Sequence, residues 1–419
     1  MAGPALEYQE ERDGGIKIQA LLYSKSVPRY LLMRYGAKRI KNLETGRFSP
    51  LQPINVPEPA LPTPGWVRVK PRLAGICGSD LATLSAESSP YFSPVTSPPF
   101  VMGHEVIGVV VEGEGFEAGE RVVVEPALGC EVRGIEPACR MCAAGRYALC
   151  LNVTKGDISP GIQTGFCRDT GGGWSDGTLV AHPSQLHRVP DGLPDEAAVT
   201  LEPLACAVHA ALKMGPSSED TTLVVGAGSV GLLVVAALRQ LTGAGCIICV
   251  AKHARQREEA LRLGADEVVH PKDVYGALPE MLGTEAHRPE LGKPVVLGGA
   301  DKVFECVGSP GTMEDAIRLT RPGGEVALVG MPGARSCLDL TPLWHGEVKL
   351  SGAYAYGFEE YEGERIKTFE LAMRIVPELG LEKLVGPSFR LTDYQEAISA
   401  ARSAGREGNV KVVFDLRGQ

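Results

Sequence analysis

Four cysteines fall between positions 130 and 150, in a stretch rich in arginine and glycine, and their side chains could hold a metal. They are Cys130, Cys139, Cys142 and Cys150. Four thiolates at this spacing suit a closed tetrahedral zinc site, which would stabilise a loop too polar to pack by itself. The signal is strongest for the last three, because a long interval follows Cys130 and because Cys167 competes as the fourth ligand. Free thiols are the disfavoured alternative, since unligated cysteines usually lie in apolar surroundings.

A second set of possible metal ligands is spread over a much longer stretch of chain. Its members and their neighbours are Cys77, Ser79, Asp80, His104, Glu105 and Glu202. A thiolate, an imidazole and a carboxylate, with one position left open to water or substrate, form a catalytic zinc site. Each residue alone has a more common structural interpretation, because most single histidines are hydrogen-bonded within a fold and most Glu-Pro pairs mark turns. The combination, in this order, is therefore what favours a catalytic metal.

A glycine-rich motif indicates a nucleotide site. It reads Gly226-Ala227-Gly228-Ser229-Val230-Gly231, and it follows an apolar strand pattern and opens an apolar helix pattern. In such a motif the first glycine makes a tight turn, the second lets a pyrophosphate approach the backbone, and the third lets helix and strand pack closely. The amino terminus of the helix then receives the anion. We therefore expect a dinucleotide here, the alternative being a glycine-rich turn without a ligand.

The residues after the next strand bear on the choice of nucleotide. Enzymes that use NAD place an acidic residue there to hold the ribose hydroxyls, whereas this chain has Ala251. Several cations follow it, namely Lys252, His253, Arg255 and Arg257. They favour NADP over NAD, because they attract a 2′-phosphate that a carboxylate would repel. The alternative is that these cations form the exposed first turn of a helix. Nearby Cys246 and Cys249 are expected in the core, because residues three apart on a strand point to opposite faces.

The patterns around these motifs predict an α/β protein. The first half is rich in short β segments, proline and glycine, which indicates a β-dominated domain. From about residue 202, strands alternate with helices, as in strand 222–225 and helix 229–240, which is typical of a doubly wound parallel sheet of Rossmann type. A further helix is expected around 364–376, and a final strand at 410–414 could rejoin the first domain. We therefore expect a catalytic domain in 1–204, a dinucleotide domain in 205–353 and a return of the chain in 354–419.

Composition narrows the class of protein. The chain has 419 residues, 44% of them hydrophobic and 22% charged, with a net charge of −9. These values argue against a disordered or membrane-spanning chain and leave no broad basic field for nucleic acid. We expect no nucleic-acid and no membrane partner. The acidic amino terminus lacks the layout of a secretory signal, so a cytoplasmic enzyme is expected. Residues 24–50 are locally basic, which suggests a solvated loop, a subunit contact or a phosphate site.

Taken together, these motifs resemble the zinc-dependent medium-chain dehydrogenase/reductase superfamily, of the alcohol dehydrogenase type. Within it, the pattern is most similar to the polyol and threonine dehydrogenase branch. The resemblance extends from about Lys17 to Phe414 and includes the segment from Arg321 to Gly330. It implies a GroES-like catalytic domain, a Rossmann domain, two zinc ions per chain, and a homodimer or homotetramer joined through the dinucleotide-domain sheet.

The resemblance also implies roles for individual residues. The matches to Cys77 and His104 are zinc ligands, while Glu105 and Glu202 align with acidic positions that bind the metal directly or through its water. The four cysteines of the loop match the structural zinc site of the family.

Further roles concern the surroundings of the metal. Asp80 aligns with a carboxylate that orients the ligand histidine, and Ser79 aligns with a hydroxyl that relays the substrate proton. Lys411 matches a basic residue near the cofactor phosphates or the zinc. Ala82 stands where some relatives have a relay histidine, so the outer proton path departs from the family pattern. The insertion at 24–50 has no family counterpart.

The function implied is hydride transfer between NAD(P) and a secondary alcohol, polyol or hydroxylated metabolite. Two alternatives stay open from the sequence alone. One is a metal-independent quinone or enoyl reductase of the same superfamily, which the joint presence of the ligand residues disfavours. The other is a non-catalytic, nucleotide-binding structural protein. Substrate choice depends on pocket side chains that could include Trp174, Tyr91 and Tyr354.

Overall fold

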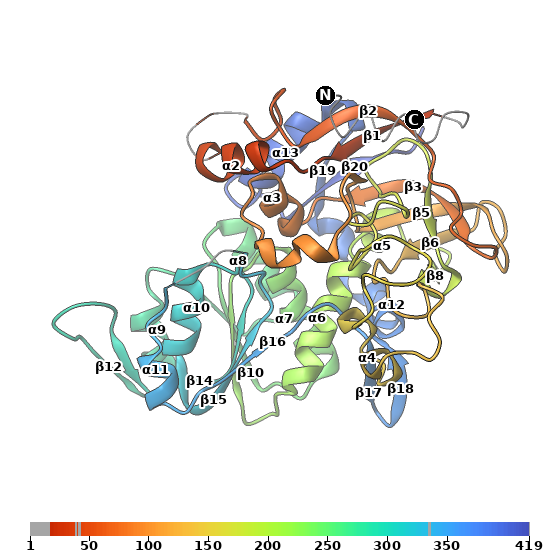
Figure 1. Cartoon of the computed structure of the whole chain (residues 1–419). Helices are drawn as coiled ribbons and strands as arrows, with labels where there is room; N and C mark the ends of the chain where they lie inside the picture. Colours follow the sequence, from red (N-terminus) through yellow and green to blue (C-terminus); the bar gives the residue numbers. More distant parts are fainter. Residues whose placement is uncertain (1–16, 38–39, 41–42, 334–336, 419) are drawn as a thin grey trace. The chain divides into compact units, whose positions relative to one another are not determined.

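The computed structural model describes residues 17–37, 40, 43–333 and 337–418, and it divides into two compact units. The first unit comprises Met1–Glu202, Gly380–Ala404 and Lys411–Gln419, and the second comprises Pro203–Leu379 and Gly405–Val410. Figure 1 labels the elements of each unit. Each unit is described below by itself.

The first unit is built on two sheets that position the candidate ligands. In the smaller, antiparallel sheet, β1 (Lys17–Tyr23) lies between β2 (Leu51–Pro57) and β4 (Phe100–Val101). The larger sheet has the strand order β19-β20-β3-β5-β6-β8, and β7 also pairs with β3. Its strands are β3 (Val67–Gly75), β5 (Val106–Glu112), β6 (Arg121–Val124), β7 (Leu179–Ala181), β8 (Leu186–Arg188), β19 (Val385–Phe389) and β20 (Lys411–Asp415).

Short helices connect these strands. They are α2 (Val27–Gly36), α3 (Gly78–Leu84), η1 (Pro90–Val95), α4 (Arg140–Ala143), η2 (Tyr147–Leu149), η3 (Pro183–Gln185), α5 (Asp195–Ala198), η4 (Leu381–Leu384), η5 (Leu391–Asp393) and α13 (Tyr394–Ser403). Strand β20 runs antiparallel to β3, with Val413 opposite Gly75. The expected final strand is therefore present, and it joins the first unit.

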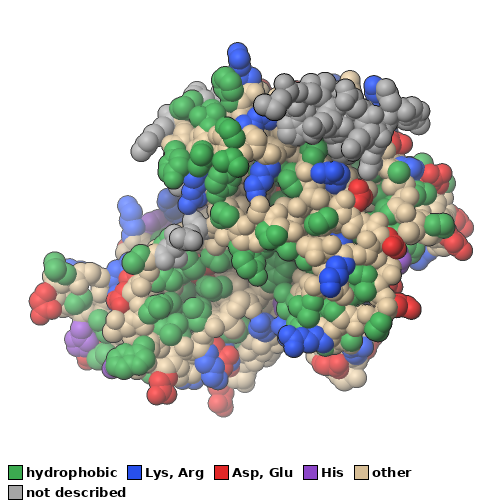
Figure 2. Space-filling view, in the orientation of Figure 1, with side chains coloured by type: hydrophobic (Ala, Val, Ile, Leu, Met, Phe, Trp, Pro, Cys, Tyr) green, Lys and Arg blue, Asp and Glu red, His purple; other side chains and the backbone are tan. Residues whose placement is uncertain are grey.

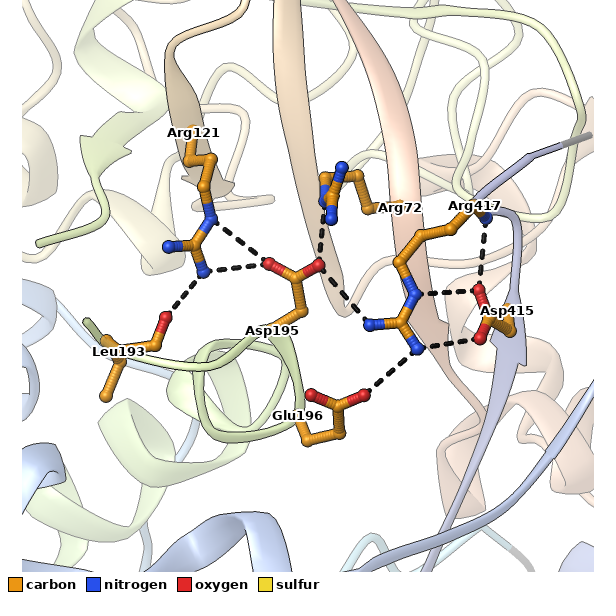
Figure 3. A network of polar contacts seen from close by, with 7 residues as sticks. All are labelled: Arg72, Arg121, Leu193, Asp195, Glu196, Asp415 and Arg417. Atoms are coloured by element: carbon orange, nitrogen blue, oxygen red, sulfur yellow. Dashed lines mark hydrogen bonds and ion pairs between the residues drawn. The ribbon is translucent and has the colours of Figure 1, made fainter. Parts of the chain in front are cut away.

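A buried carboxylate fastens this returning strand to the rest of the first unit (Figure 3). Asp195, only 5% exposed, accepts hydrogen bonds from Arg72 of β3 at 2.7 Å and from Arg121 of β6 at 2.8 Å. Arg417, just beyond β20, lies 3.6 Å from Asp195 and donates to Asp415 at 2.7 Å. Three guanidinium groups thus surround one carboxylate, which satisfies the buried charge.

The second unit contains a parallel sheet of six strands in the order β11-β10-β9-β14-β15-β16. These are β11 (Glu267–Val269), β10 (Cys246–Val250), β9 (Thr221–Val225), β14 (Ala300–Glu305), β15 (Thr320–Leu328) and β16 (Lys349–Gly352). The order doubles back at β9, so that β10 and β14 flank the first strand. A doubly wound Rossmann sheet has this arrangement, and it places ligands where the order reverses. The predicted fold class, a β-rich domain with a Rossmann domain, is confirmed.

The second unit contains seven described helices. They are α6 (Leu201–Met214), which begins in the first unit, and α7 (Ser229–Leu241), α8 (Ala254–Arg262), α9 (Val274–Leu282), α10 (Pro310–Arg318), α11 (Thr341–His345) and α12 (Thr368–Leu379). Of these, α7, α8 and α10 pack on strands of the parallel sheet. Helix α7 packs beside α8, and α10 packs beside α11 (Figure 1). Two hairpins, β12 (Glu285–His287) with β13 (Val295–Leu297) and β17 (Phe358–Tyr361) with β18 (Glu364–Lys367), complete the unit.

The carboxyl-terminal part differs from the sequence expectation. The expected return at 354 lies inside the second unit, because the first unit resumes only at Gly380. Residues 364–367 form strand β18, and the expected helix begins at Thr368 instead. The reason is local: Phe369 of α12 is fully buried and its ring meets that of Tyr356 at 4.8 Å, which keeps this segment in the second unit.

Among the described residues, no helix is both long enough and apolar enough to cross a membrane.

Candidate active site

Cys77, His104 and Glu105 come together at the ends of two paired strands. Strand β3 ends just before Cys77, and β5 begins just after Glu105; the two strands are antiparallel neighbours, with Ala74 opposite Val106. One ligand atom from each of the three residues lies within 4.8 Å of the others. His104 and Glu105 are buried, whereas Cys77 is half-buried. Soft sulfur, imidazole nitrogen and carboxylate oxygen in one such cluster match the ligand preferences of zinc.

Asp80 orients two members of this cluster. Cys77 precedes the first turn of α3, and its backbone N–H donates to Asp80 Oδ2 at 2.9 Å. The other carboxylate oxygen of Asp80 lies 3.3 Å from His104 Nδ1. Burial acts to lower the pKa of His104, but the Asp80 charge outweighs it, so this pKa is raised well above the usual value. With Nδ1 facing the carboxylate, Nε2 is the nitrogen left for a metal, as is usual for metal-binding histidines.

Glu105 is held by a cation from the returning strand. Lys411, at the start of β20, forms an ion pair with Glu105 Oε2, and both side chains are almost fully buried. Burial acts to lower the pKa of Lys411, but the Glu105 charge raises it. Gly75 makes room for this pair, because a Cβ there would overlap Glu105 Oε2. The sequence analysis expected Lys411 near either the cofactor phosphates or the zinc. In the structure it lies beside the candidate zinc ligands.

Ser79 and Glu202 lie outside the three-residue cluster. Ser79 is half-buried in the first turn of α3, next to Asp80. Glu202 is 6% exposed at the start of α6, and its charge acts on Lys411, which places it in the same neighbourhood. The described ligand cluster contains Cys77, His104 and Glu105 only.

Trp174 supports the site from within the core, a role that the sequence analysis missed. It is fully buried, and its Nε1 donates to the Gly75 carbonyl at 3.1 Å. Gly103, with φ +98°, lies against the indole ring, because a Cβ there would overlap Trp174. Phe166 also packs against the His104 ring, with centroids 5.9 Å apart. A glycine directly before the candidate histidine is the one sequence signal for such close packing.

The structure also brings the four loop cysteines together. The sulfur atoms of Cys130, Cys139, Cys142 and Cys150 all lie within 4.8 Å of one another. Backbone N–H groups point at them, as from Cys130 to Cys142 Sγ at 3.4 Å and from Cys139 to Cys130 Sγ at 3.3 Å. Burial acts to raise the pKa of Cys139, but such N–H donors outweigh it and lower this pKa to about 6. Cys167 is not in the cluster; its Sγ contacts the Ser159 carbonyl at 3.4 Å.

Arg133 organises the cysteine loop, and nothing in its sequence context signals this role. Its side chain is fully buried, and it donates to the carbonyl groups of Leu128 at 3.0 Å and Lys155 at 2.9 Å. Burial lowers the pKa of Arg133, while the nearby Cys150 and Cys130 act to raise it. A buried cation near Cys130 and Cys150 offsets the negative charge that their thiolates would bring.

The glycine motif has the geometry that the sequence predicts for nucleotide binding. Gly226 has φ +102°, a conformation that favours glycine. Gly228, directly before α7, is exposed, and a Cβ there would meet nothing within 4 Å. Gly231 packs so closely that a Cβ would overlap the Gly226 carbonyl. The open position at Gly228 leaves the amino terminus of α7 accessible to an anion.

Not all cations that follow β10 are free to bind an anion. Arg255 is paired with the buried Glu259 at 2.6 Å. Lys252 and Arg257 are exposed, and among the described residues neither has an ion-pair partner.

Arg406 lies near the cations that follow β10. The sequence analysis missed it because Arg406 is far from β10 along the chain. Burial lowers the pKa of His253, followed by the charges of Lys252 and Arg406. The adjacent Gly405 packs on the imidazole, because a Cβ there would lie 2.8 Å from His253 Cδ2. Arg406 itself is exposed, and no ion pair to it is found within the described part of the chain.

Comparison with known proteins agrees with this geometry. Residues 63–191 match the family model described as "Alcohol dehydrogenase GroES-like domain", and residues 229–371 match that described as "Zinc-binding dehydrogenase". L-threonine 3-dehydrogenase of Pyrococcus horikoshii is 30% identical, over 90% of this chain and 98% of its own. Sorbitol dehydrogenase of Arabidopsis thaliana is 29% identical, over 87% and 92% respectively.

A solved structure is also similar. The putative zinc-binding dehydrogenase of Sinorhizobium meliloti, bound to NADP, is 25% identical, with a TM-score of 0.69 over 96% of this chain and 99% of its own. The two family matches lie in both units and include the cysteine loop and the cluster of Cys77, His104 and Glu105. The chain thus belongs to the zinc-dependent medium-chain dehydrogenase/reductase superfamily, of the alcohol dehydrogenase type, in its polyol and threonine dehydrogenase branch.

Proposed function

We propose that this protein oxidises a secondary alcohol, in a polyol or hydroxylated metabolite, and reduces NADP, with the reverse reaction also available. The observation that carries the proposal is the cluster of Cys77, His104 and Glu105, with Asp80 oriented on two of them. The alternatives of a metal-independent reductase and of a structural nucleotide-binding protein leave this set of ligands without a purpose.

The donor sets of both clusters fit zinc. The four sulfurs of the loop form a closed set, as expected of a structural ion. The other cluster offers three ligand atoms and so leaves a coordination position for water or substrate, as expected of a catalytic ion. Each of two buried ligands faces a charged group, because Glu105 Oε2 pairs with Lys411 and His104 Nδ1 lies beside Asp80. We infer two zinc ions per chain.

A zinc ion held here would act as a Lewis acid that lowers the pKa of a bound alcohol. Asp80 fixes the ring orientation of His104 and the backbone at Cys77, so both ligands are in place before substrate arrives. Lys411 holds the Glu105 carboxylate by an ion pair, while a ligand atom of Glu105 stays within 4.8 Å of those of Cys77 and His104. The pair would position Glu105 as a ligand of the ion or of its water.

The proton released from the alcohol needs an acceptor. Ser79 is half-buried beside Asp80, and its hydroxyl can pass a proton to solvent. Ala82, one turn of α3 further on, carries no group that could continue the relay. We propose that the relay ends in water at Ser79, without a histidine.

Cofactor choice follows from charge at the end of β10. Ala251 leaves the ribose site without a carboxylate, while Lys252, Arg257 and Arg406 offer cations without a partner among the described residues. A 2′-phosphate would neutralise them, so NADP is the proposed cofactor. The test is calorimetric binding of adenosine 2′,5′-bisphosphate and of AMP to wild type, Lys252→Ala and Arg406→Ala. Each variant should weaken the bisphosphate about tenfold or more and AMP little. Arg255→Ala is the control, since Glu259 already neutralises that cation.

Two further proposals concern the oligomeric state and the cellular location of the protein. Strand β16 forms one edge of the parallel sheet, and an unpaired edge can join a second copy. We propose a homodimer or homotetramer in the cytoplasm, to be tested by light scattering and by localisation of a tagged chain.

The decisive experiment on function combines metal and activity measurements. Purified protein is analysed for zinc and then assayed with NADP and NAD against secondary alcohols, sugar alcohols and β-hydroxy amino acids. We expect two zinc ions per chain and reduction of NADP by at least one class. A chain that holds zinc only in the cysteine loop and reduces neither nucleotide would overturn the proposal.

A further inference from the structure

Helix α2 lies between the paired strands β1 and β2 in the sequence, and only one of its faces is packed. Met33 is buried against Leu43 and Ala86, with Tyr30 partly buried beside them. Arg34 donates to the Ala86 carbonyl at 3.2 Å, and Ser26 caps the amino terminus of the helix. These contacts fix which side of α2 faces outward.

The outward face of α2 is apolar. Val27, Leu31 and Tyr35 follow each other at intervals of four residues and are 72%, 47% and 71% exposed. At this spacing they form one row along the helix. Leu32, 37% exposed, adjoins the row, and Pro28 falls within the same arc. A surface helix normally directs its polar face outward. This arc contains no charged residue. The helix therefore exposes to solvent an apolar face of the kind that surface helices usually bury.

The apolar surface continues beyond the helix. Ile40 is 51% exposed, and its side chain and that of Leu32 both lie beside Gly36, 3.7 Å from the position of an ideal Cβ there. Figure 2 shows hydrophobic side chains gathered over α2, with lysine and arginine side chains beside them. We call Val27, Leu31, Leu32, Tyr35 and Ile40 the α2 patch.

Cations without carboxylate partners lie on α2 and in the segments that flank it in the sequence. Lys25 donates to Ser93 at 2.5 Å, and Arg29 donates to Ser24 at 3.0 Å. Arg47 lies over the Phe48 ring at 4.7 Å. Together with Arg34, these cations form no ion pair with any described carboxylate, although most other arginines of the chain do. Four exposed or half-exposed cations therefore have no anionic partner among the described residues.

The charge of this segment is opposite to that of the rest of the chain. Residues 24–50 carry seven lysines and arginines and one acidic residue, Glu44, which is paired with Arg402, while the whole chain has a net charge of −9. Three of those cations, Lys38, Arg39 and Lys41, lie outside the described residues. A local basic and apolar surface on an acidic protein calls for an anionic, apolar partner.

We propose that the α2 patch docks the enzyme on an anionic lipid surface, with its apolar row in the headgroup layer and its cations on the lipid charges. Interfacial helices combine apolar residues with flanking lysines and arginines in this way, and cytoplasmic leaflets carry negative charge. A symmetric contact with a second copy would place the same unpaired cations opposite each other, so charge disfavours it. The proposal revises the expectation, drawn from whole-chain composition, that no membrane takes part; it does not depend on the reaction catalysed.

The test is sedimentation of the full-length enzyme with large vesicles. One set contains phosphatidylcholine alone, and the other contains about one third phosphatidylserine, a fraction chosen to give a strongly negative surface. We expect binding to the phosphatidylserine vesicles to be at least tenfold stronger, and to weaken as salt is raised because exposed charges are screened.

Variants locate the contact. Leu31→Glu combined with Tyr35→Glu should reduce vesicle binding at least tenfold while leaving alcohol oxidation in buffer unchanged. Arg34→Gln combined with Arg47→Gln should remove the preference for phosphatidylserine. Leu291→Glu is the matched control, because Leu291 is 91% exposed on the β12–β13 hairpin, far along the chain from α2. It should bind as wild type does.

Three outcomes would overturn the proposal. Wild-type enzyme could fail to bind phosphatidylserine vesicles at low salt, or the α2 double variant could bind as well as wild type. The double variant could also dissociate an oligomer in light scattering without a change in lipid binding, which would assign the patch to a contact between copies.

Discussion

The two metal-ligand clusters of the first unit are built in opposite ways. All four loop cysteines come from residues 130–150, whereas Cys77, His104 and Glu105 reach each other through the pairing of β3 with β5. The first cluster is closed by four sulfurs, and the second has three ligand atoms, one of them from the Glu105 carboxylate that pairs with Lys411. A closed local cluster is suited to holding a loop, and an open cluster assembled by a sheet is suited to turnover.

The groups around the two clusters also differ: those around the loop cysteines stabilise the sulfurs, and those around the other cluster orient single ligands. Backbone N–H groups and the buried Arg133 stabilise the sulfurs of the loop. Side-chain carboxylates and Lys411 surround the other cluster, where they orient individual ligands. Removing a ligand should therefore affect stability in one cluster and catalysis in the other.

Cys77→Ser should have the largest effect on activity. Loss of one ligand weakens an ion expected to supply several kcal/mol to the reaction, so turnover should fall on the order of a thousandfold. Zinc content should fall from two ions toward one, while melting temperature changes little. Exposed Cys337 provides the control, and Cys337→Ser should behave as wild type. Full activity of Cys77→Ser would contradict the assignment of the catalytic cluster.

Cys139→Ser should show the reverse pattern. An ion held by the four cysteines would crosslink a loop of about twenty residues, and such a crosslink contributes about 3 kcal/mol in the loop-entropy view. Melting temperature should fall by several degrees, and one zinc should be lost, while the enzyme that stays folded turns over substrate at a rate near that of wild type. Thermal unfolding and zinc analysis on the same sample decide this. A loss of turnover without a loss of stability would reverse the roles of the two clusters.

Sequence alone predicted the local cluster better than the assembled one. Spacing brings Cys139, Cys142 and Cys150 together in almost any fold of the loop, but it cannot choose between Cys130 and Cys167, which both lie within reach. That choice depends on how the loop closes around Arg133, whose backbone carbonyl partners, such as Leu128 and Lys155, carry no sequence signature.

The cluster of Cys77, His104 and Glu105 could be predicted only by combining the residue types with the resemblance to a known family. Nothing local connects Lys411 with Glu105, because their contact exists only when β20 returns antiparallel to β3. Elsewhere, long periodic elements were predicted well: helix 229–240 is observed as Ser229–Leu241. The hairpin of β17 and β18 was not predicted, since its strands have only four residues each and are largely exposed.

Asp80→Asn should have an intermediate effect, because Asp80 positions ligands without contacting substrate. Loss of such a hydrogen-bonded carboxylate typically costs about 10- to 100-fold in metal affinity or activity. A chelator should remove the catalytic zinc faster than from wild type, while loop zinc stays. Glu125→Gln is the matched control, because Glu125 makes a similar buried contact with His187, at 2.7 Å, outside either cluster. Equal zinc loss in both variants would reduce Asp80 to a general structural role.

Cys167→Ala should have the smallest effect, and it tests the limit of the four-sulfur assignment. Cys167 is fully buried, but its sulfur contacts the Ser159 carbonyl and not the cluster. Removing one buried atom should cost about 1 kcal/mol, a shift of a few degrees in melting temperature at most, with two zinc ions per chain retained. Cys130→Ala, in contrast, should lose the loop zinc. If Cys167→Ala lost that ion and Cys130→Ala kept it, the loop would close through the more distant cysteine, and the contrast between a local and an assembled cluster would weaken.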